Sequence, residues 1–239
     1  MKTISVVMAT YNGEKYLRNQ LDSIIPFLLP NDELIVSDDG STDKTLDILN
    51  EYINRYPNIV LVDGPHQGVV KNFEFGLSKS TKDVVLICDQ DDIWLPEKID
   101  KMRNVFSANE NLYLVLHDMF ISNDYKIENN IEGVSSFERR RRKHGVFNNW
   151  WYSGYFGCCM GLSKSFLKKV LPFTKHVKLY DQWIGLLGEY YKSSLFINDK
   201  LIIHREHNNN VSKEKTSVLY KIKARFFLLL SYLEKKKNK

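Results

Sequence analysis

The sequence predicts an α/β protein with a mostly parallel central sheet flanked by helices. Segments of strand length alternate with segments of helix length over the first 95 residues. The strand segments are apolar at every position, as in strands buried on both faces of a parallel sheet. Polar residues gather directly after several of them, where the carboxyl ends of parallel strands form ligand sites.

This alternation defines four strands and the three helices between them. β-Branched and apolar runs predict the strands, which cover residues 3–8, 34–37, 58–62 and 83–88. Apolar residues spaced three and four apart predict the helices, which lie within residues 11–28, 46–53 and 69–78.

The alternation is looser after residue 96. We expect a strand at residues 113–117, a helix at residues 180–191 and two short strands at residues 195–197 and 201–203. Residues 124–143 are polar and end in four arginines and a lysine, which predicts a loop.

The basic charge is concentrated at the C-terminal end. Residues 212–239 hold nine Lys or Arg and two Asp or Glu, which gives this segment a net charge of +7. The net charge of the whole chain is +5, so the other residues together carry −2. This argues against nucleic acid as a partner and favours a local contact with something anionic. We divide the chain into a domain over residues 1–212, in parts 1–95 and 96–212, and a basic amphipathic C-terminal helix over residues 213–239.

Composition and cysteine usage indicate a compartment. The hydrophobic share of 43% and the charged share of 26% are ordinary for a globular protein. Three cysteines without zinc or redox spacing favour a reducing cytosol. No apolar run approaches the ~18 residues of a membrane span. We expect a cytoplasmic protein, with the basic helix as a candidate contact to the inner face of the cell membrane.

Three acids occupy four positions after the fourth strand, in the stretch LICDQDDIW. Asp89 and Asp91 are separated by one residue, which on an extended segment places both carboxylates on one side. Such oxygens are the ligands that Mg²⁺ and Mn²⁺ prefer, often together with phosphate oxygens. The alternative is a solvated acidic turn. The sequence contains neither a glycine-rich dinucleotide fingerprint nor a P-loop, so phosphate must be handled by a metal and side chains.

Six segments, in order, carry a family resemblance: SVVMATYNGEKYL, ELIVSDDGSTD, ICDQDDIWLPEKI, GCCMGLS, YDQWIG and HREHNNNVS. Together they span roughly residues 3 to 212. The chain resembles the family 2 glycosyltransferases with the Rossmann-like GT-A fold, and within them the bacterial rhamnosyltransferase-like branch that builds surface polysaccharides. One departure is Ala9, where many members carry proline; it removes no functional group.

The resemblance implies a role for each matching residue. Tyr11 stacks on the nucleobase, Asp39 accepts a base N–H, and Asp89 and Asp91 hold Mn²⁺ or Mg²⁺. His207 matches a histidine that completes the metal site in some members; a hydrogen-bonded histidine is the alternative. We expect the nucleotide sugar to contact Thr10, Tyr11, Asn12, Asp38, Asp39, Lys71, Asp89, Gln90 and Asp91.

Asp181, in YDQW, matches the general base of the family, although an acid at a helix N-terminus is also favoured by the helix dipole. Asp92 neighbours the metal acids and is expected to contact ribose, metal-bound water or the acceptor. Trp151 and Trp183 are either part of an acceptor platform or ordinary core residues. Lys71 either touches phosphate or is a solvated helix lysine.

The implied activity is metal-dependent, inverting transfer of a sugar from dTDP-rhamnose or a UDP-hexose to a hydroxyl of a glycan, with a lipid-linked acceptor. Two other classes remain open: a nucleotidyltransferase, and a non-catalytic nucleotide- or glycan-binding scaffold. The basic helix lies on an anionic membrane surface, docks on the domain, or forms a dimer contact.

Overall fold

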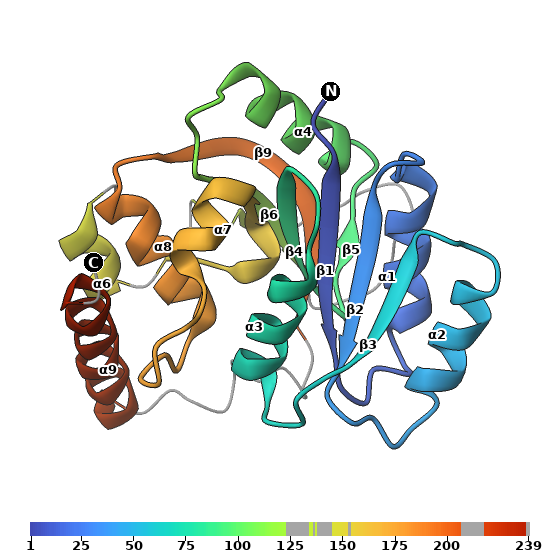
Figure 1. Ribbon diagram of the computed structural model, residues 1–239, viewed down its shortest axis with the longest axis horizontal. Helices are drawn as coiled ribbons and strands as arrows, with labels where there is room; N and C mark the ends of the chain where they lie inside the picture. Colours follow the sequence, from blue (N-terminus) through green and yellow to red (C-terminus); the bar gives the residue numbers. More distant parts are fainter. Residues whose placement is uncertain (123–133, 136, 138–144, 153, 207–217, 238–239) are drawn as a thin grey trace.

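Four parallel strands form one half of the sheet in the computed structural model (Figure 1). Their order across the sheet is β3-β2-β1-β4, with β1 in the middle. Their bounds are Ile4–Thr10 for β1, Glu33–Asp38 for β2, Ile59–Asp63 for β3 and Val84–Asp89 for β4. The mostly parallel α/β class expected from the sequence is confirmed, and each strand lies within two residues of its expected range.

Helices connect these strands where the apolar spacing predicts them. The first three are α1 (Leu17–Ile24), α2 (Thr45–Ile53) and α3 (Val69–Lys79), and a 3₁₀ turn at Ile25–Phe27 follows α1. The structure describes all residues except 123–133, 136, 138–144, 153, 207–217 and 238–239.

The second half of the sheet mixes directions. Its order continues as β8-β6-β9-β5, with β8 antiparallel to both β4 and β6, and β9 parallel to β6. The strands are β5 (Ile93–Trp94), β6 (Leu114–Ser122), β7 (Val134–Ser135, paired with β6), β8 (Met160–Ser163) and β9 (Ser194–Arg205).

The remaining helices surround this half. They are α4 (Lys98–Ala108), α6 (Val146–Tyr152), α7 (Lys164–Val170), α8 (Tyr180–Tyr190) and α9 (Val218–Lys237), with a 3₁₀ turn at Gly157–Cys159 before β8. The expected loop at residues 124–143 lies almost wholly outside the described residues. In the part of the chain that the structure covers, we find no helix long and apolar enough to cross a bilayer.

The expectation of two short strands at residues 195–197 and 201–203 is wrong, because they belong to one strand, β9. The register against β6 shifts between the pairs His117–Ile197 and Asp118–Lys200, so Asn198 and Asp199 sit in an irregularity of the ladder. A bulge accommodates extra polar residues without ending a strand. The polar break in the sequence therefore marks a bulge, not a turn.

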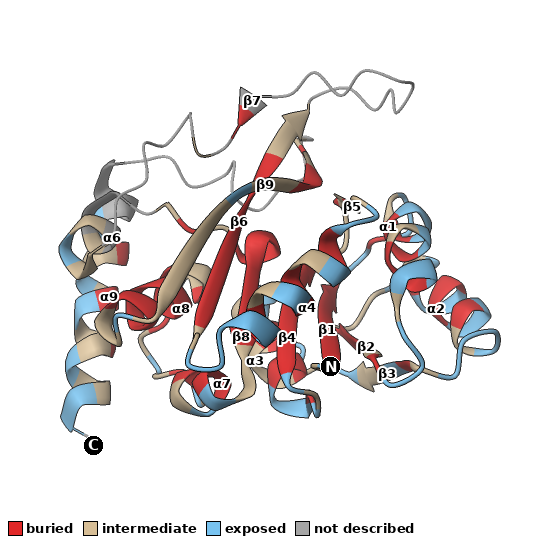
Figure 2. Cartoon of the chain, turned by 90° about the horizontal axis from the view of Figure 1, so that it is seen from above, coloured by how far each residue is buried: buried red, intermediate tan, exposed pale blue. Residues whose placement is uncertain are grey.

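The sheet is the buried centre of the molecule (Figure 2). Two cations of α4 are buried as well. Arg103 of α4 is 2% exposed and binds Asp32 with an Nη2–Oδ2 distance of 2.6 Å. Lys98, at the start of α4, is fully buried, and its ammonium group donates to the Cys158 carbonyl at 2.8 Å. These bonds fasten α4 to the residue directly before β2 and to the 3₁₀ turn at Gly157–Cys159.

Candidate active site

The loops after β1 and β2 are joined by Asp38. Its carboxylate accepts from the Thr10 hydroxyl at 2.9 Å and from the Ser41 amide and hydroxyl at 2.8 and 2.6 Å. Asp38 is 3% exposed, so these bonds replace the water it would otherwise bind. Thr10 is buried as well. The structure therefore gives both residues an internal role: they shape the loop that presents Asp39.

Asn12 and Gln90 hold the loop after β1 from two sides. Asn12 has a positive φ of 48°, and its side-chain oxygen accepts from the Thr42 amide at 2.8 Å. The Gln90 amide donates to the Tyr11 carbonyl and accepts from the Tyr11 amide, both at 3.0 Å. The backbone of Tyr11 is thereby fixed while its ring stays 55% exposed. An exposed ring on a fixed backbone is suited to stacking on a flat ligand.

Asp39 faces the loop between β3 and α3. Its two carboxylate oxygens accept from the Gln67 amide at 3.2 Å and the Gly68 amide at 2.7 Å. Gly68 has a φ of 86° and directly precedes α3. Asp39 thus links the carboxyl end of β2 to the N-terminal end of α3, beside the loop that carries Tyr11.

The acids of the LICDQDDIW stretch lie at the end of β4, and their environments differ. Asp89 is the last residue of the strand. Burial, and after it the nearby charges of Asp92 and Asp91, together raise the pKa of its carboxyl to about 8. These surroundings disfavour the charged form of the Asp89 carboxyl group, and a cation bound beside it would stabilise that form. The observation fits a divalent cation bound by Asp89 and Asp91, both of which supply the oxygen ligands that Mg²⁺ and Mn²⁺ prefer.

Asp92 has a different partner, which corrects its expected contact with ribose, metal-bound water or the acceptor. Its side chain is fully buried, and its Oδ1 lies 2.7 Å from Nδ1 of His204 on β9. Burial favours the neutral carboxyl, but the charge and hydrogen bond of His204 outweigh it and lower the pKa of Asp92. With no exposed surface, Asp92 anchors the acidic turn to β9 instead of contacting a ligand.

His204 is the matching half of this pair. Burial alone would lower its pKa, but Asp92 and then Asp89 and Asp91 raise it to about 10. Atoms of Asp92, Cys158 and His204 that can bind metal lie within 4.8 Å of one another. Nitrogen and sulfur donors of this kind suit zinc better than Mg²⁺ or Mn²⁺. The Asp92–His204 ion pair already neutralises the charge of this group without a metal ion.

The first turn of α8 lies against the end of β4. The Tyr180 hydroxyl donates to Asp89 at 3.4 Å, and its ring packs on Phe73 of α3 at a centroid distance of 4.2 Å. Asp181 is the next residue, and its Oδ1 accepts from the Gln182 amide at 2.7 Å. The charge of Asp181 contributes to the raised pKa of Asp89. Two acids far apart in the sequence thus share one site.

Three further expectations concern residues 151, 183 and 207. Trp183 does not line an acceptor surface: it is fully buried, and its indole N–H points to the Val170 carbonyl at 3.4 Å. Of the two alternatives for Trp183, an acceptor platform or an ordinary core residue, its burial favours the core residue, since α8 is buried on nearly every side. Trp151 belongs to α6, but its side chain lies outside the described part. His207 lies outside the described residues altogether.

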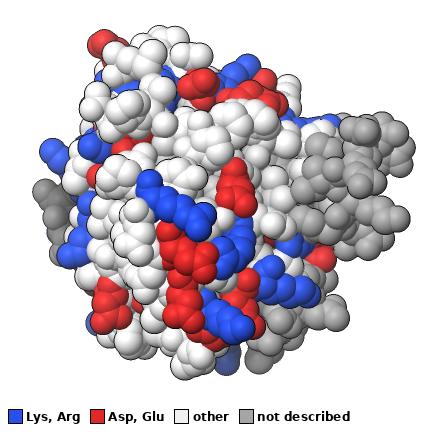
Figure 3. All heavy atoms as spheres, turned by 90° about the vertical axis from the view of Figure 1, so that its right-hand side faces the viewer, with Lys and Arg blue, Asp and Glu red and all other residues white. Residues whose placement is uncertain are grey.

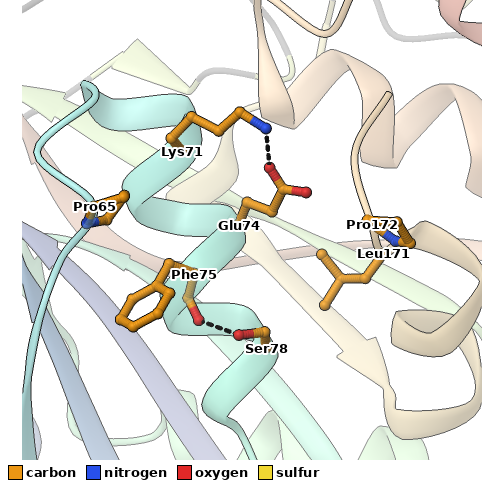
Figure 4. A pocket seen from close by; sticks show the side chains of 7 residues that line it. All are labelled: Pro65, Lys71, Glu74, Phe75, Ser78, Leu171 and Pro172. Atoms are coloured by element: carbon orange, nitrogen blue, oxygen red, sulfur yellow. Dashed lines mark hydrogen bonds and ion pairs between the residues drawn. The ribbon is translucent and has the colours of Figure 1, made fainter. Parts of the chain in front are cut away.

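Lys71 forms an ion pair with Glu74 of the same helix, and its expected contact with phosphate stays a prediction. Its ammonium group lies 2.6 Å from the Glu74 carboxylate (Figure 4). Both residues line a pocket of about 460 Å³ on the outer side of α3. The other lining residues are Pro65, Phe75, Ser78, Leu171 and Pro172. None of the acids described above lines this pocket.

Sequence reasoning missed Tyr180, His204 and Asn72. Asn72 is 1% exposed and donates to the Ser37 carbonyl at 2.8 Å, which packs α3 against the end of β2. Tyr180 could have been found from its position next to Asp181. His204 stands in the HREH run with His207, but only the fold brings it to Asp92.

The comparison with known families gives one match over most of the chain. The sequence profile described as Glycosyl transferase family 2 matches residues 5–171. The dTDP-rhamnosyl transferase RfbG of Shigella flexneri is 28% identical over 218 residues, covering 85% of this chain and 72% of that protein. An uncharacterized glycosyltransferase of Haemophilus influenzae is 36% identical over 110 residues, 46% of this chain and 44% of that protein. This chain therefore spans less than half the length of the latter relative.

Solved structures share the architecture. S. aureus TarS 1-349 in complex with UDP-GlcNAc superposes with a TM-score of 0.69 at 19% identity, over 91% of this chain and 62% of that chain. Mannosyltransferase PcManGT from Pyrobaculum calidifontis, in complex with GDP-Man and Mn²⁺, superposes with a TM-score of 0.65 at 16% identity, over 89% and 59%. The likeness confirms the expected GT-A fold.

Proposed function

The chain belongs to glycosyl transferase family 2, and on that premise we propose that it transfers a sugar from a nucleoside-diphosphate sugar to a hydroxyl of a glycan. The observation that carries the proposal is the approach of α8 to β4. Through the Tyr180–Asp89 contact of 3.4 Å, Asp181 shares a site with acids about 90 residues earlier in the chain. The proposed metal-dependent transfer uses acids at two places in one site, to hold the metal near the leaving group and to accept the proton of the attacking hydroxyl.

The donor occupies the edge formed by the ends of β1, β2 and β4. The exposed Tyr11 ring stacks on the nucleobase, and Asp39 accepts a base N–H. A carboxylate that already receives two amides, from Gln67 and Gly68, is held in place for that bond. Residues 1–95 then form the nucleotide-sugar-binding part and residues 96–212 the acceptor-binding part.

Asp89 and Asp91 would hold Mn²⁺ or Mg²⁺ at the diphosphate. A cation bound there would neutralise the charge that develops on the diphosphate as it leaves. The raised pKa of Asp89 supports this proposal, because burial, and then the charges of Asp92 and Asp91, disfavour its charged form, which a bound cation would stabilise. Gln90 and the Asp92–His204 pair fix the turn that carries the two ligands.

Asp181 removes the proton from the acceptor hydroxyl. A hydroxyl attacks weakly until a carboxylate accepts its proton, and attack from the face opposite the diphosphate inverts the configuration at C1. The donor is dTDP-rhamnose or a UDP-hexose, and the acceptor is a lipid-linked glycan. The names of RfbG, a dTDP-rhamnosyl transferase, and of the TarS complex with UDP-GlcNAc support a pyrimidine donor.

The test is a comparison of Asp181→Asn with the wild-type protein. The assay measures UDP or dTDP released from UDP-glucose, UDP-GlcNAc and dTDP-rhamnose, with Mn²⁺ and a lipid-linked glycan acceptor present. Loss of the base should lower kcat about 10²- to 10⁴-fold and leave KM nearly unchanged.

Asp199→Asn is the matched control, because Asp199 is an acid that pairs with Lys101 at 2.8 Å on the surface. It should behave like the wild type. Unchanged release by Asp181→Asn would remove the base from the proposal. A wild-type protein that releases neither nucleotide from any donor would contradict the transferase function.

A further inference from the structure

One side of α9 is packed on the domain. Ala224, Leu228 and Ser231 are buried, with exposed fractions of 7%, 5% and 0%. The ring of Tyr232 packs edge-on against Tyr190 of α8 at a centroid distance of 5.3 Å. The Trp150 indole of α6 donates to the Arg225 carbonyl at 2.9 Å. These contacts hold one side of α9 against the domain, so the opposite side of the helix faces outward.

The outer side carries an apolar stripe. Ile222, Phe226, Leu229 and Leu233 are 61%, 57%, 40% and 45% exposed. Their spacing of four, three and four residues keeps them on one side of the helix, over about 16 Å at a rise of 1.5 Å per residue. Four large apolar side chains in a row are a contiguous patch, which monomeric proteins rarely leave without a partner.

The charges beside the stripe have one sign. Lys223, Lys236 and Lys237 are exposed on α9. By helical spacing, Lys236 and Lys237 fall on opposite sides of the stripe. The single acid of α9, Glu234, lies 4.0 Å from His176 of the domain. At the other end of the molecule, around α2, Lys, Arg, Asp and Glu are interspersed (Figures 1 and 3).

We propose that this outer face of α9 docks on an anionic lipid bilayer, with the apolar stripe in the interface and the lysines on the headgroups. An apolar side bordered by lysines is the pattern of helices that lie in a membrane surface, and each nearby Lys adds attraction to anionic lipid. A second copy of the chain fits the face less well. Two such stripes in contact would bring lysines together, while Glu234, the single acid of α9, lies beside His176 of its own domain.

α9 is linked to the candidate active site through Arg225. Arg225 of α9 donates to the Gln182 side chain at 3.2 Å, one residue after Asp181, and the charge of Asp181 acts on the Arg225 guanidinium. Docking α9 on a membrane therefore holds the first turn of α8 close to the lipid surface. Resting on the proposed function, this gives the acceptor a class: a glycan on a lipid carrier, whose hydroxyl is presented to Asp181 from the membrane.

The experiment is co-sedimentation of the full chain with vesicles of phosphatidylcholine alone or with 30% phosphatidylglycerol. The wild type should co-sediment with the anionic vesicles at low salt and much less at high salt. It should not co-sediment with the neutral vesicles. The double variant Phe226→Ser/Leu229→Ser should weaken binding by at least about tenfold, since both side chains leave the interface. Lys236→Glu/Lys237→Glu should weaken it similarly, and only at low salt.

The matched control is Leu46→Ser/Arg55→Glu on and beside α2, an exposed apolar residue and an exposed cation at the far end of the molecule. It should bind as the wild type does. Equal binding of all variants, or equal binding to neutral vesicles, would overturn the proposal. So would a wild type that ignores vesicles but forms a dimer lost in Phe226→Ser/Leu229→Ser, as measured by sedimentation velocity. Binding does not depend on turnover, so its failure is distinguishable from a failure of the catalytic proposal.

Discussion

Removing the charge of Asp92 should destabilise the protein more than removing any surface acid. Asp92 is fully buried, and the His204 side chain is 14% exposed. In Asp92→Asn the histidine keeps its buried position but loses the charge that raises its pKa to about 10. It must then either stay charged without a partner or give up its proton.

Breaking a buried ion pair by removing one partner costs about 3–5 kcal/mol. The 2.7 Å contact and the full burial of Asp92 place this pair in that class. The amide of Asn can still form a hydrogen bond with the ring, so we expect the lower end, about 3 kcal/mol. The double variant Asp92→Asn/His204→Gln should recover part of the loss, because no buried charge is left unpaired.

The assay is urea unfolding at pH 7.5 with EDTA, followed by far-UV circular dichroism. The matched control is Arg18→Gln, which breaks an ion pair of the same length, 2.7 Å to Glu51, between side chains that are 47% and 45% exposed. Exposed pairs contribute little, so this variant should unfold near the wild-type midpoint. A midpoint for Asp92→Asn equal to that of Arg18→Gln would refute the reasoning, and a double variant less stable than Asp92→Asn would refute the pairing.

Three further outcomes follow from the same geometry. The pKa of His204 is raised from 6.5 to about 10 in the folded state, so its contribution to stability is fully present below pH 6.5 and is lost as the pH rises through about 10. The urea midpoint of the wild type should therefore fall over this pH range, and that of His204→Gln should fall less. A methyl group in Gly13→Ala would collide with the Gln90 amide and free Tyr11, so calorimetry should show nucleotide affinity about tenfold lower with little change in thermal stability. Trp183→Ala should lower the free energy of unfolding by about 3–5 kcal/mol, whereas an acceptor-platform residue would alter acceptor KM with no such loss.

The strands and helices of the first half could be predicted because local patterns determine them. Apolar runs of strand length and apolar spacing of helix length occur in the order of the elements. The strands follow the expected ranges within two residues and α2 and α3 within one, whereas α1 covers only Leu17–Ile24 of the expected residues 11–28. β9 could not be predicted as one strand, because the polar pair Asn198–Asp199 interrupts the local pattern. Its continuity depends on pairing with β6, which the sequence of β9 alone does not contain.

The position of the acids in the fold could be predicted from the sequence. Acids directly after a buried strand point to a cation or a solvated turn, and the fold places Asp89 at that position. The roles of neighbours were not predictable. Asp38 turns into the protein and Asp39 turns to the loop before α3, and Asp92 is bound to a histidine 112 residues away. Such differences depend on which side of the backbone faces the core.

The most direct test of the central claim is a calorimetric titration of the protein with UDP and dTDP, each with and without Mn²⁺, on the wild type and on Asp91→Ala. The account predicts binding of a pyrimidine diphosphate that requires the metal and is lost in Asp91→Ala. Metal-independent binding that survives in Asp91→Ala would contradict the role assigned to the acids after β4, and the absence of binding under every condition would contradict the nucleotide-sugar site itself.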